Sequence, residues 1–199
     1  MPEPVGTATP LGAGAVLEAV CATAAQTRSL ARALGTQLVG GDVVVLDGPL
    51  GAGKTTFVQG LALGLGVTAP VTSPTFVLAR HQRPDPGGPR PDGPELVHVD
   101  AYRLGGALEL DDLDLDSDLD RAVVVVEWGE GLAERLSASR VQVRLARAEG
   151  RHPGGGPGTV EAPADGPGDE PRSVRVQVVG VGPVRTERLV AAVREAVPC

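Results

Sequence analysis

The sequence predicts an α/β fold of the P-loop NTPase type, in which helices flank a mostly parallel sheet with an antiparallel region late in the chain. Short β-branched runs alternate with helical patterns, which is typical of a parallel sheet with helical crossovers. A glycine-rich loop follows the first of these runs and leads directly into a helix. The length of 199 residues suits a single domain, which we place at residues 15–199 behind a disordered tail, residues 1–14.

Hydrophobic spacing predicts the first elements. Residues 16–39 are predicted to form a helix, because apolar side chains recur at intervals of three or four, and Gly40-Gly41 follows as a stop signal. The all-apolar run 43–46 is typical of a strand that is buried on both faces. A second helix is predicted over residues 55–65, closed by Gly66.

The rest of the domain is predicted to be mainly strands. The extended segments are short apolar or alternating runs at residues 75–79, 96–100, 123–126, 141–145 and 174–179. The third is the most apolar and is predicted to be central. An acidic stretch, 106–120, is predicted to be helical in part, and residues 185–197 form a closing helix.

Two segments rich in proline and glycine, 82–94 and 149–172, interrupt this pattern. Neither has the apolar content to form a core, so we expect both to be flexible insertions.

Composition excludes several classes of protein. The net charge of −7 argues against a chain held on nucleic acid by its overall field. Cys21 and Cys199 have no C-x-x-C spacing, which argues against a disulfide framework or a zinc site. With no signal-peptide pattern and no apolar run of membrane-spanning length, the sequence predicts a cytoplasmic protein without a membrane partner.

The segment Gly48–Thr55 matches the phosphate-binding pattern G-x-x-x-x-G-K-[ST] in full. Glycines allow the backbone to approach phosphate oxygens, and the helix N-terminus supplies N–H donors. Lys54 is the chain's only lysine; we expect it to bind the β- and γ-phosphates and Thr55 to ligate Mg²⁺. The predicted nucleotide contacts of this loop are Gly48, Gly51, Ala52, Gly53, Lys54, Thr55 and Thr56.

Two carboxylates, Asp100 and Glu127, each follow an apolar run that is predicted to be a strand. Carboxyl ends of parallel strands meet at the mouth of the sheet, where a P-loop enzyme needs an acid beside Mg²⁺. Spacing alone does not decide which acid binds the metal and which orients water. Between the P-loop helix and these strands, the segment 71–76 places the Ser73 and Thr75 hydroxyls around a proline, which predicts either a γ-phosphate-sensing loop or an ordinary turn.

The aspartate-rich run between residues 111 and 120 could suggest a calcium loop starting at Asp116. Its sixth position would be Arg121 rather than glycine, and the loop would include an apolar strand. An exposed acidic surface is the better interpretation.

Taken together, the motifs resemble the TsaE (YjeE) family of bacterial ATPases from about Thr27 to Leu145. The resemblance rests on the P-loop, S-P-T-F at 73–76, H-x-D-x-Y-R-L at 98–104 and E-W at 127–128. It implies an Mg²⁺-dependent ATPase that supports threonylcarbamoylation of adenosine 37 in tRNA, with TsaB and TsaD as partners and tRNA reached through the complex.

By position, the resemblance puts Thr55 and Glu127 at the Mg²⁺ site and Asp100 at an acid needed for hydrolysis. It also implies that Thr27 lies near the adenine and that Ser73 and Thr75 lie in a switch-like loop. An acid of the family's loop is Pro49 here.

Some alternatives remain open. The second insertion obscures a nucleotide-contacting arginine, for which Arg147 and Arg151 are candidates. A P-loop small-molecule kinase is the rival enzyme, although the Pro/Gly-rich insertions are poor substrate lids. A GTPase is disfavoured, because a chain without Asn cannot contain the guanine-reading N-K-x-D motif.

Overall fold

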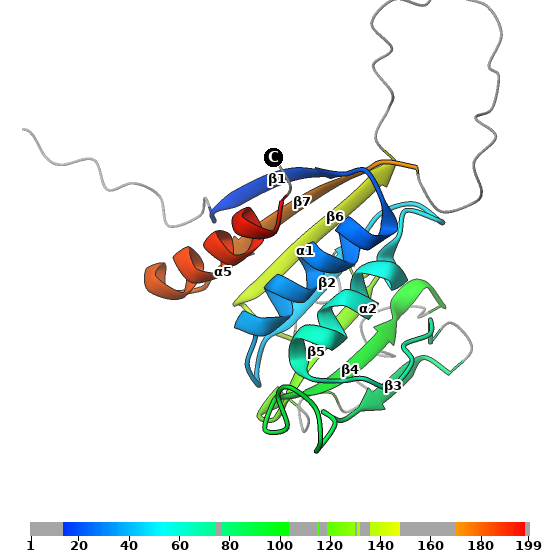
Figure 1. Ribbon diagram of the computed structural model, residues 1–199, viewed down its shortest axis with the longest axis vertical. Helices are drawn as coiled ribbons and strands as arrows, with labels where there is room; N and C mark the ends of the chain where they lie inside the picture. The colour runs from blue at the N-terminus through cyan, green and yellow to red at the C-terminus, as the bar shows by residue number, and fades with distance from the viewer. Residues whose placement is uncertain are drawn as a thin grey trace, which may run out of the picture.

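The computed structural model describes residues 14–74, 77–103, 115, 119–129, 131, 136–147 and 170–197. Within them, seven strands form one sheet in the order β1-β7-β6-β2-β5-β4-β3 (Figure 1). The strands are β1 Val16–Cys21, β2 Val43–Asp47, β3 Ala79–Gln82, β4 Glu95–Asp100, β5 Ala122–Glu127, β6 Arg140–Arg147 and β7 Arg172–Val179. The helices are α1 Ala24–Gln37, α2 Lys54–Leu65 and α5 Pro183–Ala196, with a 3-10 turn at Ala101–Arg103.

The predicted fold class is confirmed. The four adjacent strands β6, β2, β5 and β4 are mutually parallel, and β7 pairs antiparallel with β6 late in the chain. Both edges are antiparallel as well, through β1 on β7 and β3 on β4. The sequence did not predict these two edge pairings.

The helix predicted over residues 16–39 is wrong in its first part. Val16–Cys21 forms the edge strand β1, and α1 begins only after Thr23, whose hydroxyl accepts a hydrogen bond from Gln26 N at 3.2 Å. The partner of β1 is β7, which lies far along the chain. A pairing of this range leaves no trace in the local spacing of apolar residues, so the helical pattern was extended too far upstream.

The core has two layers because residues alternate between the faces of the sheet. Val44 and Leu46 belong to a cluster with α1, α2 and α5, and the three helices lie on this face in Figure 1. Val43 and Val45 belong to a smaller cluster on the opposite face. Residues 43–46 of β2 are buried on both faces and all apolar, as expected for an inner parallel strand.

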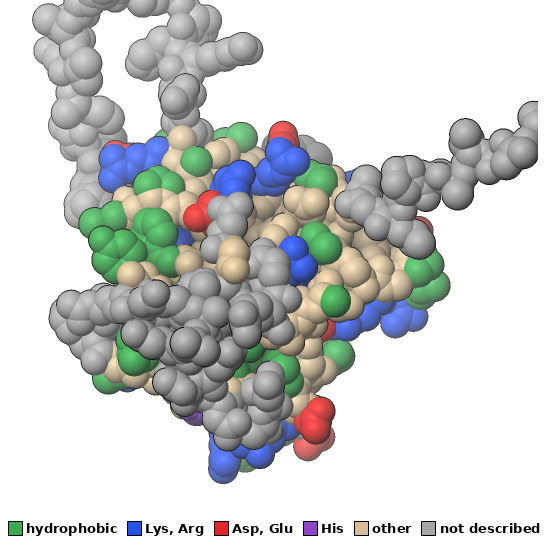
Figure 2. Space-filling view, turned by 180° about the vertical axis from the view of Figure 1, so that it is seen from behind, with side chains coloured by type: hydrophobic (Ala, Val, Ile, Leu, Met, Phe, Trp, Pro, Cys, Tyr) green, Lys and Arg blue, Asp and Glu red, His purple; other side chains and the backbone are tan. Residues whose placement is uncertain are grey.

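On the opposite face (Figure 2), β6 and β7 present polar side chains, whereas β1 exposes Val16 and Val20 on either side of Glu18. Arg144 and Arg175 stand directly opposite one another in the β6–β7 register. Each is paired with an acid on the next strand: Arg144 with Asp47 at 3.0 Å and Arg175 with Glu18 at 3.3 Å. These flanking pairs offset the repulsion between the two guanidinium groups.

Helices α1 and α2 touch through glycines. A Cβ added at Gly60 would lie 2.2 Å from Arg28 O, and one at Gly64 would lie 2.3 Å from Arg32 O. The two backbones therefore approach too closely for any larger residue. This contact sets the position of α2, whose N-terminus carries the phosphate loop.

The first Pro/Gly-rich insertion is attached to these helices. The Arg90 guanidinium donates to the carbonyls of Gly35 at 3.1 Å, Gly64 at 3.3 Å and Leu38 at 2.9 Å. These carbonyls belong to the last turns of α1 and α2, where intrahelical donors run out. Arg90 thus caps both helices, while the expected flexibility of the rest of the segment stays a prediction.

Several predictions fall outside the described residues. They concern the tail over 1–13, Thr75 and Phe76, most of the acidic stretch 106–120, and most of the second insertion. Among the helices that the structure describes, none is both long enough and apolar enough to span a bilayer.

Candidate nucleotide site

The loop between β2 and α2 has a backbone with positive φ, which favours glycine, at Gly48, Gly51 and Gly53. Gly48 has φ 145° and Gly53 has φ 100°, and a Cβ at Gly48 would lie 2.2 Å from Leu145 O. Gly53 is the N-cap of α2 and provides no side-chain cap. The amides of the first turn therefore remain available to an anion, with the helix dipole in its favour.

Lys54 is folded back over this loop. Its Nζ donates to Gly48 O at 2.7 Å and to Pro49 O at 3.2 Å. The same ammonium lies 3.8 Å from the ring centroid of Trp128, a cation–π distance. The backbone of Trp128 has φ 61°, so the ring is held over Lys54 at some conformational cost.

Burial lowers the pKa of Lys54 from its usual 10.5. Glu127, Asp100 and Asp47 oppose this shift, because their negative charges favour the ammonium. An anionic ligand placed on Lys54 would act in the same direction as these acids.

The two predicted carboxylates lie side by side at the mouth of the sheet. Asp100 and Glu127 end β4 and β5 and are register partners, and both are buried. Glu127 Oε1 accepts a hydrogen bond from Thr55 Oγ1 at 3.3 Å. Asp100 Oδ1 accepts one from Tyr102 N at 3.0 Å.

This donor set fits Mg²⁺. Carboxylate and hydroxyl oxygens are hard ligands, and Mg²⁺ typically takes one or two carboxylates while water and phosphate oxygens complete its shell. Among the described residues, no group of three or more acid, histidine or cysteine side chains is arranged to hold a metal ion by itself. Thr55 and Glu127 would hold the ion, with Asp100 beside them.

A pocket of about 620 Å³ joins these groups. Its lining residues are Leu50, Gly51, Gly53, Lys54, Thr55, Thr56, Ser73, Asp100, Tyr102, Glu127 and Trp128. Ala52 and Gly48 belong to the same loop, and Ala52 is buried. Thr75 lies outside the described residues, so only Ser73 of the predicted switch loop is placed at the pocket.

A smaller hollow of about 190 Å³ continues past the P-loop toward α1. Its wall includes Thr27, predicted from the resemblance, together with Gly51, Gly53 and Thr56. Thr27 is buried, and its hydroxyl donates to Thr23 O at 3.3 Å.

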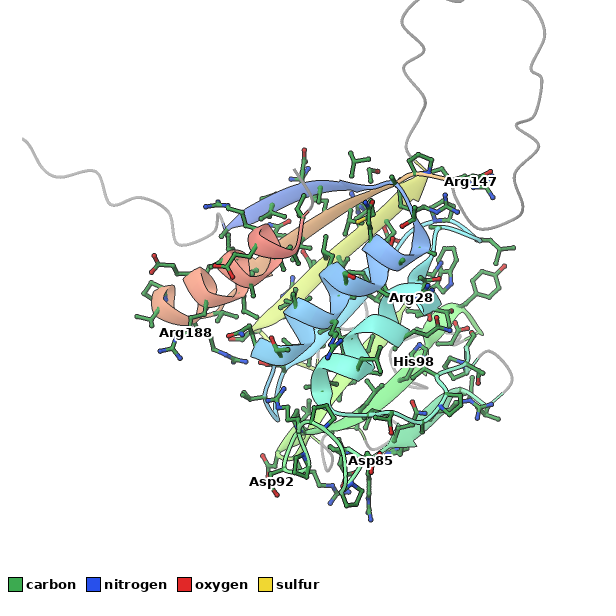
Figure 3. The ribbon with its side chains drawn as sticks, viewed as in Figure 1. Arg28, Asp85, Asp92, His98, Arg147 and Arg188 are labelled. Carbon is green, nitrogen blue, oxygen red and sulfur yellow. The ribbon has the colours of Figure 1, made fainter. Side chains whose placement is uncertain are left out.

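Two arginines stand at this end of the loop. Arg147 and Arg172 are register partners at the ends of β6 and β7, and Figure 3 labels Arg147 there. Arg172 donates to Gly51 O at 3.4 Å and lines the hollow. Both arginines also pair with Glu170 at 3.3 Å.

The sequence had named Arg147 and Arg151 as candidates for a nucleotide-contacting arginine. Arg151 lies outside the described residues. Arg172 was missed because the sequence analysis included it in the predicted flexible insertion 149–172, whereas it begins β7. The β6–β7 pairing brings it to the P-loop.

His98 was also missed as a site residue. Its Nε2 lies 2.9 Å from Glu127 Oε1, and both side chains are almost fully buried. The signal was present in the sequence, since His98 precedes Asp100 by two residues on one strand and therefore shares its face.

The model of one protein family, described as "Threonylcarbamoyl adenosine biosynthesis protein TsaE", matches residues 21–153. The chain belongs to the TsaE family. The matched range includes the P-loop, both carboxylates and Thr27, whereas Arg172 lies beyond it.

Individual relatives agree with this assignment. A "tRNA threonylcarbamoyladenosine biosynthesis protein TsaE" from Mycobacterium bovis is 58% identical over 127 residues, which is 61% of this chain and 73% of the relative. The protein of the same name from Streptomyces coelicolor is 56% identical over 124 residues, covering 62% and 80%. That from Bacillus subtilis is 39% identical over 124 residues, covering 62% and 73%.

A solved TsaE-like structure has the same architecture. The crystal structure of YdiB from Bacillus subtilis superposes with a TM-score of 0.63 at 28% identity, covering 92% of this chain and 96% of that one. The overall fold of this chain is therefore shared with a solved structure.

Proposed function

We propose that this TsaE-family chain is an Mg²⁺-dependent ATPase subunit that supports threonylcarbamoylation of adenosine 37 in tRNA, with TsaB- and TsaD-like partners. One observation carries the ATPase part: the P-loop hydroxyl of Thr55 contacts the buried carboxylate of Glu127, with Asp100 beside it. A P-loop needs these groups together to bind a metal–nucleotide complex. The names of the relatives support the tRNA pathway.

The roles follow from position. The α2 amides and Lys54 bind phosphate oxygens, and Thr55 with Glu127 holds Mg²⁺, which when bound neutralises charge on the β- and γ-phosphates. Asp100, one strand away, orients the attacking water. Arg172 and Thr27 contact the part of the nucleotide that extends toward α1, through the hollow beside Gly51.

Exposed apolar side chains around the pocket support a partner protein. Leu50 is 89% exposed, Tyr102 is 68% exposed and Val77 is 51% exposed. Leu50 and Tyr102 line the pocket. Figure 2 shows hydrophobic side chains gathered at the edge of the molecule where the inner strands end, the left edge in that view. A partner that covered this edge would exclude water from the nucleotide.

Hydrolysis assays test the ATPase. We expect slow turnover by the isolated chain and faster turnover once TsaB- and TsaD-like proteins are added. Asp100→Asn should lower kcat by about a hundredfold or more while nucleotide affinity stays similar, as for other water-orienting groups. Undiminished hydrolysis by both Asp100→Asn and Glu127→Gln would show that the acids are structural.

Nucleotide choice and pathway are tested separately. A clear preference for GTP over ATP would contradict the proposal, and ADP production that depends on a small metabolite instead of protein partners would favour a kinase. For the pathway, purified TsaB- and TsaD-like proteins of the source organism should form tRNA threonylcarbamoyladenosine with this chain and ATP, and much less without it.

A further inference from the structure

We infer that His98 is a positioning residue that fixes the Glu127 carboxylate for the divalent cation. The inference rests on the proposed function, because it concerns how the metal of that site is held. Figure 3 labels His98 on β4, beside α2. It is separated from the pocket by Glu127, since it is fully buried and does not line the pocket.

The buried carboxylate of Glu127 needs a hydrogen-bond partner inside the core. It ends β5, whose six residues are all buried and otherwise apolar, and its side chain is 5% exposed. Burying a carboxylate is costly unless hydrogen bonds replace its hydration. His98 provides such a bond from the core side, with its Nε2 lying 2.9 Å from Glu127 Oε1.

One oxygen of Glu127 receives both recorded bonds. Oε1 lies 2.9 Å from His98 Nε2 and 3.3 Å from Thr55 Oγ1. Two bonds from different elements, β4 and α2, fix the rotamer of the carboxylate. The Thr55 hydroxyl can donate its proton to Glu127 and still offer an oxygen lone pair to a cation. The three side chains therefore form a chain from the core to the metal position.

The chain of bonds also fixes the tautomer of His98. An ionised carboxylate only accepts hydrogen bonds, so Nε2 must carry the proton. Nδ1 is buried without a hydrogen-bond partner. A neutral ring with its proton on Nε2 leaves no donor unpaired at Nδ1, and the remaining unpaired acceptor is the cost of placing a histidine here.

A histidine that served only to fill the core would need no bond to Glu127. Leu96, two residues earlier on the same face of β4, fills its own part of the core with an apolar side chain. His98 in place of a leucine makes physical sense only if its ring nitrogen is used.

The first experiment measures binding without turnover. A non-hydrolysable ATP analogue is titrated by calorimetry in Mg²⁺ and in EDTA, and the ratio of the two dissociation constants reports the contribution of the metal. His98→Leu should lower this ratio by about tenfold, as loss of such ligand-supporting bonds does elsewhere. Affinity in EDTA should stay within about twofold of wild type.

Two further variants make the result specific. His98→Gln keeps an N–H at the position of Nε2 and should restore most of the ratio. Leu96→Ala is the matched control, a core change on the same strand that destabilises the fold without touching Glu127. A wild-type ratio in His98→Leu, or a loss as large in Leu96→Ala or in His98→Gln, would overturn the inference.

A second readout does not depend on nucleotide. Long-range ¹H–¹⁵N spectra of the free protein should show one ring with its proton on Nε2, identified among the chain's three histidines by its disappearance in His98→Gln. An Nε2 without a proton would overturn the inference. If wild type binds no nucleotide at all, the proposed function fails, and the spectrum still reports whether His98 donates to Glu127.

Discussion

The ammonium group of Lys54 is bound within the protein and must exchange these contacts for phosphate oxygens when a nucleotide binds. It is bound by two loop carbonyls and the Trp128 ring. We predict that Lys54→Met weakens ADP binding by about ten- to a hundredfold, since a hydrogen bond to a charged group contributes about 1.5–3 kcal/mol. Trp128 is the chain's only tryptophan, so its fluorescence should follow ADP binding.

The matched control for that change is Arg83→Ala. Arg83 is an exposed cation paired only at the surface, with Glu95. If both variants lost affinity equally, the effect would come from net charge and not from the P-loop contact.

The lowered pKa of Lys54 also predicts that ADP affinity depends on pH. Because burial lowers its pKa below 10.5, the free protein loses this proton at a lower pH than an ordinary lysine would. ADP affinity should be full below the lowered pKa and should fall as pH rises through it, before 10.5 is reached. The second pKa of a phosphate group, about 6, lies well below this window.

The dissociation constant of ADP is measured by calorimetry from about pH 7.5 to about pH 10.5, the range that leads up to the usual lysine pKa. Lys54→Arg keeps its charge throughout this window. Any affinity that the variant retains should therefore stay constant, and a parallel fall in both proteins would assign the dependence to another group.

At the level of single residues, the sequence predicted those that belong to a local pattern. Lys54 and Thr55 are fixed by the P-loop itself, and Asp100 and Glu127 follow apolar runs that could only be strands. The position of Arg172 depends on the pairing of β6 with β7 across an insertion, which no local pattern reveals. Spacing puts His98 on the same face as Asp100, but its contact with Glu127 depends on how β4 pairs with β5.

Among the secondary elements, inner strands were predicted well because burial on both faces leaves an unbroken apolar run. The edge strand β1 was wrongly predicted as helix, since the four-residue spacing of Val16 and Val20 suits one face of a helix as well as one face of a strand. The contact between α1 and α2 could not be predicted either, because glycines at 60 and 64 weaken a helix pattern unless the partner backbone is known.

That contact gives a stability prediction. Gly60→Ala would favour an isolated helix by roughly 1 kcal/mol, but the new Cβ would lie 2.2 Å from Arg28 O. We therefore expect a net loss of about 1–3 kcal/mol, as for other overpacked cores, measured by urea unfolding. A stabilised Gly60→Ala protein would mean that the helices can separate at no cost.

Arg90 gives a second prediction at this scale. Its guanidinium supplies hydrogen bonds to the last turns of both helices. Arg90→Ala leaves those carbonyls without this donor and should destabilise the protein by about 1–3 kcal/mol. Arg83→Ala, which removes an exposed ion pair in the same region, should cost at most about 1 kcal/mol. Equal midpoints in urea for the two variants would contradict the capping role of Arg90.

At the scale of the whole molecule, we predict that folding does not require residues 149–169 of the second insertion. Arg147 and Arg172 are already opposite one another where β6 and β7 meet, so a short turn could join the strands. Replacing residues 149–169 by Gly-Gly shortens the connection roughly fivefold, which lowers the entropy cost of closing it by about 1.4 kcal/mol. We predict a gain in urea stability of about this size.

The variant with residues 149–169 replaced also distinguishes a role of the insertion in nucleotide binding from a role in partner binding. It retains Arg147, Glu170 and Arg172, so ADP affinity and the slow intrinsic hydrolysis should stay as in the full chain. Loss of ADP affinity would place the insertion in the nucleotide site. If intrinsic hydrolysis were normal and only its stimulation by TsaB- and TsaD-like proteins were lost, the insertion would belong to the partner interface.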